Sequence, residues 1–92
     1  MLAAVFFEST RFPWELCIEV PNEQYRDFAW HYAHSHRQDS SVGPTRVEIR
    51  QTAPMGLSVV SWREVVNFLH SKRHCAALEN LSSKIEQAYE AL

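Results

Sequence analysis

The last third of the chain constrains the fold most, because Ser61–Leu92 contains neither glycine nor proline and carries apolar residues at helical spacing. Ser61 followed by Glu64 is typical of a capping box. In this motif the serine hydroxyl accepts a hydrogen bond from the amide three residues on, and the carboxylate reaches back to the serine amide. The sequence therefore predicts a helix that begins at residue 62.

Two apolar stripes follow within this stretch. The first is Trp62, Val65, Val66 and Leu69, and the second is Leu78, Leu81, Ile85, Ala88 and Leu92. On one continuous helix the two stripes would point about 130° apart, and a helix of about thirty residues would be about 45 Å long. A domain of this length has a radius of gyration of only about 13 Å. We therefore expect a break at Ser71–His74, with helices at about 62–71 and 75–91. One unbroken helix is the alternative, and it would require a second subunit to cover it.

Four strands are predicted upstream of the last helices. Leu2–Glu8 is a nearly continuous apolar run, which indicates a strand buried on both faces and central in its sheet. Trp14–Val20 alternates between apolar and polar residues, and it is expected to form a hairpin with the first strand. Arg46–Gln51 alternates again, and Leu57–Val60 is expected to return after the turn at Thr52–Gly56.

A shorter helix is predicted between the two strand pairs. Asn22 can cap it, and its apolar stripe continues to about His36. The predicted buried residues are Tyr25, Phe28, Ala29 and Tyr32. Trp30 and His34 fall on the opposite, polar side of this helix, together with Glu23 and Asp27. The whole chain, residues 1–92, is thus predicted to be a single small α+β domain of order ββαββαα. We expect a mostly antiparallel four-stranded sheet with the helices packed on one face.

Composition supports a small folded globule. Of the 92 residues, 46% are apolar and 22% are charged, and the net charge of −2 lacks the basic excess of a general nucleic-acid binder. No basic segment precedes the first apolar run, so no signal peptide is evident, and no run approaches the length that spans a bilayer. We therefore expect a cytoplasmic protein in which Cys17 and Cys75 are free thiols. A single disulfide between them is the alternative.

The histidines suggest a metal site only weakly. His31, His34 and His36 do not converge on one side of a helix. His70 and His74 are four residues apart with Cys75 beside them, and a metal-dependent activity at these three residues is one hypothesis. The predicted break falls between the two histidines, however, and no carboxylate lies there to act as a general base. No metal site is therefore predicted.

Catalytic motifs are likewise missing from the sequence. The only glycines are Gly43 and Gly56, which leaves no phosphate-binding or dinucleotide-binding loop. No pair of carboxylates or nucleophile with an adjacent base stands out either. We therefore predict a protein that is not an enzyme, with no catalytic residue and no cofactor.

The candidate partner-binding residues are an exposed aromatic and a row of cations. Trp30 is placed where a monomer has little reason to put a tryptophan, unless a loop or the C-terminal helix covers it. Tryptophan and arginine often anchor protein interfaces. The predicted set is Trp30, His34, Arg37, Arg46 and Arg50. The leading hypothesis is a non-catalytic protein-binding module, in the format of the small inhibitors that phages and other mobile elements direct against host proteins or defence complexes.

Two other kinds of partner are alternatives to this hypothesis. The outward arginines of the third strand could meet phosphates, which would make the protein a nucleic-acid-binding regulator, although Glu48 lies between them. A homodimer is the other, through a seam formed by Leu78, Leu81, Ile85 and Leu92. No membrane partner is predicted.

Overall fold

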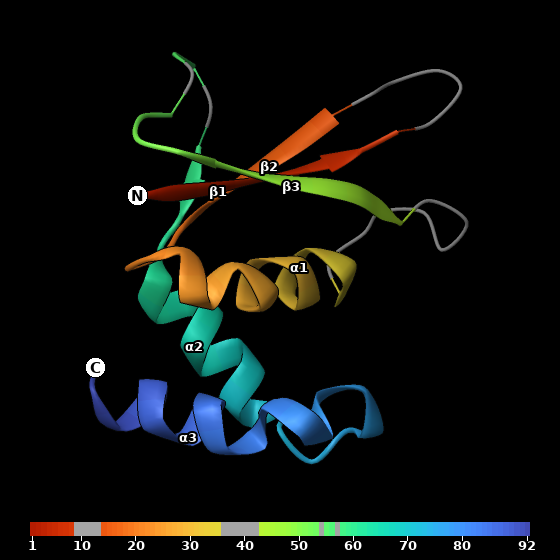
Figure 1. Cartoon of the computed structure of the whole chain (residues 1–92), viewed down its shortest axis with the longest axis vertical. Helices are drawn as coiled ribbons and strands as arrows, with labels where there is room; N and C mark the ends of the chain where they lie inside the picture. Colours follow the sequence, from red (N-terminus) through yellow and green to blue (C-terminus); the bar gives the residue numbers. More distant parts are fainter. Residues whose placement is uncertain (9–13, 36–42, 54, 57) are drawn as a thin grey trace.

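The computed structural model contains a four-stranded sheet with every described helix on one of its faces (Figure 1). It describes residues 1–8, 14–35, 43–53, 55, 56 and 58–92. The strands are β1 (Leu2–Phe7), β2 (Trp14–Glu19), β3 (Pro44–Arg50) and β4 (Val59–Val60), in the spatial order β3-β1-β2-β4. The predicted α+β class and the predicted central position of the first strand are confirmed.

β1 pairs antiparallel with both of its neighbours. Leu2 lies opposite Glu19 of β2 and opposite Arg50 of β3, so the predicted hairpin is present. Side chains of β1 alternate between the helix-covered face and the outer face, and Ala3, Ala4 and Val5 are nevertheless all fully buried. The apolar run near the N-terminus is therefore explained by its central place in the sheet.

The fourth strand departs from the prediction. It does not return beside β3; instead it lies at the opposite edge and runs parallel to β2, pairing at Cys17 and Ile18. The sheet is therefore mixed, and the prediction of a second hairpin was wrong. A strand's own pattern shows which face is buried but not which neighbour it joins. Here the last strand joins the edge from which α2 can pack on both the sheet and the first helix.

The helices begin and end close to the predicted positions. They are η1 (Glu23–Tyr25), α1 (Arg26–Ser35), α2 (Trp62–Ser71), η2 (Ala76–Leu81) and α3 (Ser82–Glu90), where η1 and η2 are 3-10 helices. The Ser61 hydroxyl accepts from the Glu64 amide at 3.2 Å, which confirms the cap of α2. The chain leaves α2 after Ser71, so the predicted break is confirmed. The segment after it differs from the prediction, because its first part is a 3-10 helix.

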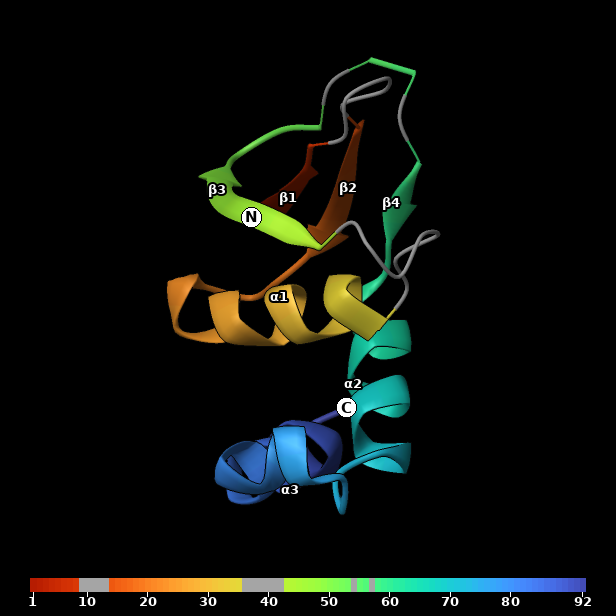
Figure 2. The same ribbon diagram turned by 90° about the vertical axis from the view of Figure 1, so that its right-hand side faces the viewer.

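Three layers result from this order. α1 lies against the sheet, α2 runs away from the sheet past α1, and α3 packs at the far end of α2 (Figures 1 and 2). One core cluster connects all three layers; it includes Val5, Phe7, Ile18, Phe28, Tyr32, Val65, Leu69, Leu78 and Ile85. The radius of gyration is 13.0 Å, as expected for a chain of this length.

Candidate partner-binding surface

The outer edge of β3 is open along the middle of the strand. The Met1 carbonyl accepts from the Val20 amide at 3.1 Å, so the odd-numbered residues of β1 direct their main-chain groups at β2. The even-numbered residues then face β3, where their partners are Arg46, Glu48 and Arg50. Because main-chain directions alternate along a strand, Val47 and Ile49 direct their N–H and C=O groups away from the sheet.

One side chain already occupies this edge. The Arg26 guanidinium, from the first turn of α1, donates to the Val47 carbonyl at 2.7 Å. This bond ties the start of α1 to the edge strand. It also shows that the Val47 carbonyl is accessible to a donor from outside the sheet.

A hollow of about 580 Å³ lies next to this edge, between the start of α1 and β3. Its lining consists of Glu23, Gln24, Arg26, Asp27, Trp30 and Val47. The Asn22 side chain caps the preceding turn by accepting from the Gln24 amide at 2.8 Å, which fixes the direction of the helix start. The hollow therefore combines an aromatic and an aliphatic wall with a rim of polar and charged groups.

The charges of this rim are only partly compensated. Lys84 of α3 lies 3.2 Å from both carboxylate oxygens of Asp27, and its amine also donates to the Gln24 carbonyl. Arg26 is held by the Val47 carbonyl, whereas Glu23 is exposed. The mouth of the hollow thus presents both positively and negatively charged side chains around an apolar floor.

The predicted binding residues are not all on this surface. Trp30 lines the hollow and is half-buried there. His34 is exposed one turn further along α1. Arg46 and Arg50 lie on the outer face of the sheet, and Arg37 and His36 lie outside the described residues.

The two arginines of the outer sheet face are both paired with glutamates. Arg46 lies 3.6 Å from Glu8 and 3.4 Å from Glu48, and Arg50 lies 3.1 Å from both Glu15 and Glu48. Both guanidinium groups also stack over the ring of Phe6, at 4.2 and 5.2 Å from its centre. The face is therefore a mixed network of charges rather than a basic row.

This network explains how a face without helices still contains buried residues. In the register, Ala4 lies between Glu48 of β3 and Cys17 of β2. The ion pair from Arg50 to Glu15 passes diagonally across β1, so its long side chains cover the small Ala4. Ala4 and Cys17 are consequently buried, at 0% and 1% exposure.

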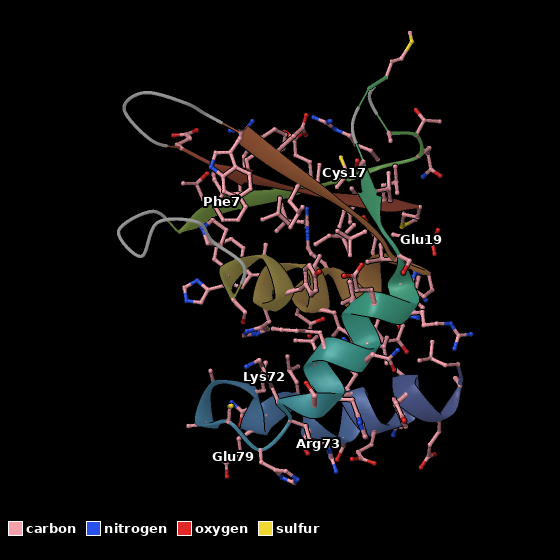
Figure 3. All side chains as sticks on the ribbon, turned by 180° about the vertical axis from the view of Figure 1, so that it is seen from behind. Phe7, Cys17, Glu19, Lys72, Arg73 and Glu79 are labelled. Atoms are coloured by element: carbon pink, nitrogen blue, oxygen red, sulfur yellow. The ribbon has the colours of Figure 1, made fainter. Side chains whose placement is uncertain are left out.

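The two cysteines are free, as predicted. Cys17 is buried on β2 beside β4 (Figure 3), and its burial, together with the nearby charge of Glu15, raises the pKa of its thiol above 9.0. Cys75 is exposed in the turn that leads into η2. Cys17 therefore does not have the setting of an activated nucleophile, because it is inaccessible and a raised pKa disfavours its thiolate.

The second histidine group has a structural role. The His70 ring stacks on Tyr89 at 3.7 Å, and its Nε2 atom lies 3.5 Å from Glu86. Arg73, at the junction between α2 and α3, contacts the same carboxylate at 2.6 Å (Figure 3). His74 and Cys75 are both exposed. Within the described segments, no three metal-ligating side chains come together, and His70 instead joins α2 to α3.

The predicted dimer seam lies mostly inside the chain itself. Leu78 and Ile85 are buried in the core, and Leu81 packs against that core from its edge. Leu92 is 39% exposed at the end of the chain. The apolar repeat after the break is thus used to attach α3 to α2, which leaves no continuous apolar row on the surface of α3.

Sequence reasoning missed Val47 and Arg26 as members of the surface. The alternation of β3 predicted that Val47 faces the core. Val47 is only half-buried, because β3 is an edge strand. No sequence signal identifies which strand becomes the edge. The helical spacing of Glu23, Asp27 and Trp30 was the available signal for the hollow, and it did place these three residues together.

No protein-family model matches this chain, and comparisons with curated proteins and with solved structures also find no match. Among the helices that the structure describes, none has the length and apolar character needed to cross a membrane. The functional argument therefore depends on the geometry of the surface around Trp30.

Proposed function

We propose that this protein is a non-catalytic protein-binding module whose contact surface is centred on Trp30. The observation that carries the proposal is the hollow beside β3, where a half-buried tryptophan and Val47 form an apolar floor within a charged rim. Apolar anchors surrounded by polar groups are the usual composition of protein interfaces. The same surface would suit an inhibitor that acts by docking on another protein.

The main-chain groups next to the hollow add to this support. Val47 and Ile49 direct main-chain groups outward from the edge of β3, and Val47 borders the same hollow as Trp30. An exposed strand edge is a common site of protein recognition. The Trp30 side chain and the main-chain groups at the edge of β3 would thus contact the same partner. A reaction is not required at such a site.

The nucleic-acid alternative has less support. Phosphate binding requires several uncommitted cations, whereas Arg46 and Arg50 both contact glutamates and share their face with four of them: Glu8, Glu15, Glu19 and Glu48. Any binding through this face should weaken steeply with salt, and binding that is indifferent to salt would exclude it.

The proposed function is tested by capturing partners of the tagged chain from its source cells and quantifying them for the parent chain and two variants. We expect Trp30→Ala to lower recovery of a stoichiometric partner about tenfold or more, since truncation of a tryptophan anchor costs about 2 kcal/mol or more. Tyr89→Ala is the matched control, because Tyr89 is an aromatic that is 43% exposed on α3, away from the hollow. Equal recovery with all three chains would contradict the proposal.

A further inference from the structure

The sequence of β3 is complementary to itself when two copies of the strand are paired antiparallel. Its middle residue is Val47, with Arg46 on one side and Glu48 on the other. A two-fold axis through Val47 places Arg46 of one copy opposite Glu48 of the second, and the reverse pair follows by symmetry. Opposite charges directly across a strand pair are favourable, and like charges are unfavourable.

The other two-fold registers fit less well. An axis through Arg46 or through Glu48 places each of these charges opposite itself. An axis through Ile49 gives the opposite-charge pair of Glu48 with Arg50, but only the last three residues of the strand then have partners within β3. The axis through Val47 alone combines opposite charges with an overlap of the whole strand. The regular part of this overlap is residues 46–48, because the register of β3 shifts at Thr45, the residue that Ile49 would face.

The main chain supports the same arrangement. Val47 and Ile49 direct their N–H and C=O groups outward, so Val47 can exchange two hydrogen bonds with its symmetry mate. Arg46 and Glu48 then form non-hydrogen-bonded pairs, in which the side chains approach most closely. The Arg26 guanidinium on the Val47 carbonyl does not prevent this, because a carbonyl oxygen has two lone pairs.

The rest of the molecule leaves this side accessible. Figure 2 shows the free edge of β3 and the N-terminal end of α1 along one side of the molecule, with no described element beyond them. α1 runs obliquely beneath β3, so a two-fold copy would place the two α1 helices side by side on the same face of one continuous sheet. Val47, where the two copies would meet, also lines the hollow that contains Trp30.

We propose that this chain forms a two-fold symmetric dimer through β3, with the axis at Val47 and with Arg46 of each copy paired to Glu48 of the other. The inference rests on the proposed function, since it names a second copy of the chain as a partner of the same surface. Arg46 and Glu48 already pair with each other within one chain at 3.4 Å, but their side chains are 54% and 43% exposed. The dimer would therefore exchange exposed ion pairs within each chain for ion pairs between the chains.

The experiment measures association by sedimentation equilibrium for the parent chain, Arg46→Glu, Glu48→Arg and an equimolar mixture of the two variants. Each variant alone places like charges opposite each other twice, so we expect its dimer to be about tenfold weaker or more. In the mixture every such pair has opposite signs, and a one-to-one heterodimer should recover the parent affinity. Arg63→Glu, at an exposed position of α2, is the control and should leave the dimer unchanged.

Three results would overturn the dimer. They are a parent chain that stays monomeric up to high micromolar concentration, a dimer that tolerates both charge reversals, and a mixture that fails to recover association. Circular dichroism of each variant identifies loss of fold as a separate cause. A monomeric parent whose capture of another protein still depends on Trp30 would remove the dimer and leave the proposed function intact, whereas loss of both effects would remove both.

Discussion

His31 gives the fold a sensitivity to mild acid. It lies on α1 between Asp27 and His34, and its partial burial lowers its pKa below 6.5, although Asp27 opposes the shift. The unfolded chain therefore binds a proton more readily than the folded chain. Above pH 6.5 His31 therefore does not lower the free energy of unfolding. As the pH falls from 6.5 through the folded-state pKa of His31, the free energy of unfolding decreases.

We accordingly expect His31→Gln to reduce the loss of unfolding free energy between about pH 7.5 and about pH 5.5. Urea titration at the two pH values measures this loss. His74→Gln is the matched control, because His74 is exposed in the turn after α2. An unchanged pH dependence in His31→Gln, or an equal change in both variants, would contradict the explanation.

The two thiols should differ strongly in reactivity. Cys17 is 1% exposed and has a raised pKa, whereas Cys75 is exposed. With a thiol-specific disulfide reagent, we expect the native protein to react at one thiol and the urea-unfolded protein at two. Cys75→Ser should remove the native reaction and leave the unfolded one. Rapid reaction of native Cys75→Ser would show that Cys17 is accessible after all.

At the scale of single elements, α2 shows most clearly what sequence can predict. Its start depends on groups three residues apart, and its end coincides with the change of apolar stripe at residues 71–75. Such local features can be derived because helix contacts connect near neighbours in sequence. The place of β4 could not be derived, since it depends on a strand forty residues earlier in the chain.

The cap of α2 yields a quantitative expectation. Ser61→Ala removes the acceptor of the Glu64 amide and should lower the free energy of unfolding by about 1 kcal/mol. Ser58→Ala, a substitution of an exposed serine just before β4, should stay within about 0.5 kcal/mol of the parent. Urea denaturation of the two variants provides the comparison. Equal stability of both would mean that the cap contributes nothing.

At the scale of the whole molecule, α3 is attached through the core as well as through surface contacts such as that of Lys84 with Asp27. Ile85 is fully buried in the cluster that also contains Phe28 and Leu69. Ile85→Ala should therefore lower the free energy of unfolding by about 2–5 kcal/mol. Leu92→Ala, at the exposed chain end, should change it by less than about 0.5 kcal/mol.

Ile85→Ala also tests whether the chain unfolds cooperatively. Trp14, Trp30 and Trp62 report on β2, α1 and α2, whereas circular dichroism reports on all the helices, including α3. We expect the two signals of Ile85→Ala to change together in urea, as in a two-state transition. A helical signal that is lost before the tryptophan signal would show that α3 unfolds on its own.

Only part of the candidate surface could be predicted from the sequence. Helical spacing placed Trp30 on the same side of the helix as Glu23 and Asp27, and the three residues line one hollow in the structure. Their neighbour Val47 was not predicted there, because an apolar residue on an alternating strand has the same pattern at a sheet edge as at its centre. The predicted arginine row became a network of ion pairs because Glu8, just after β1, meets glutamates of β2 and β3 there in the folded chain.

The central place of β1 has a consequence for how the chain is made. Of the four described strands, β1 leaves the ribosome earliest. It needs β2 on one side and β3 on the other, and β3 ends only at residue 50. While the first half of the chain is being synthesised, β1 therefore has one open flank composed almost entirely of apolar residues. Nascent chains that stop before β3 should consequently be the species that aggregate or recruit chaperones.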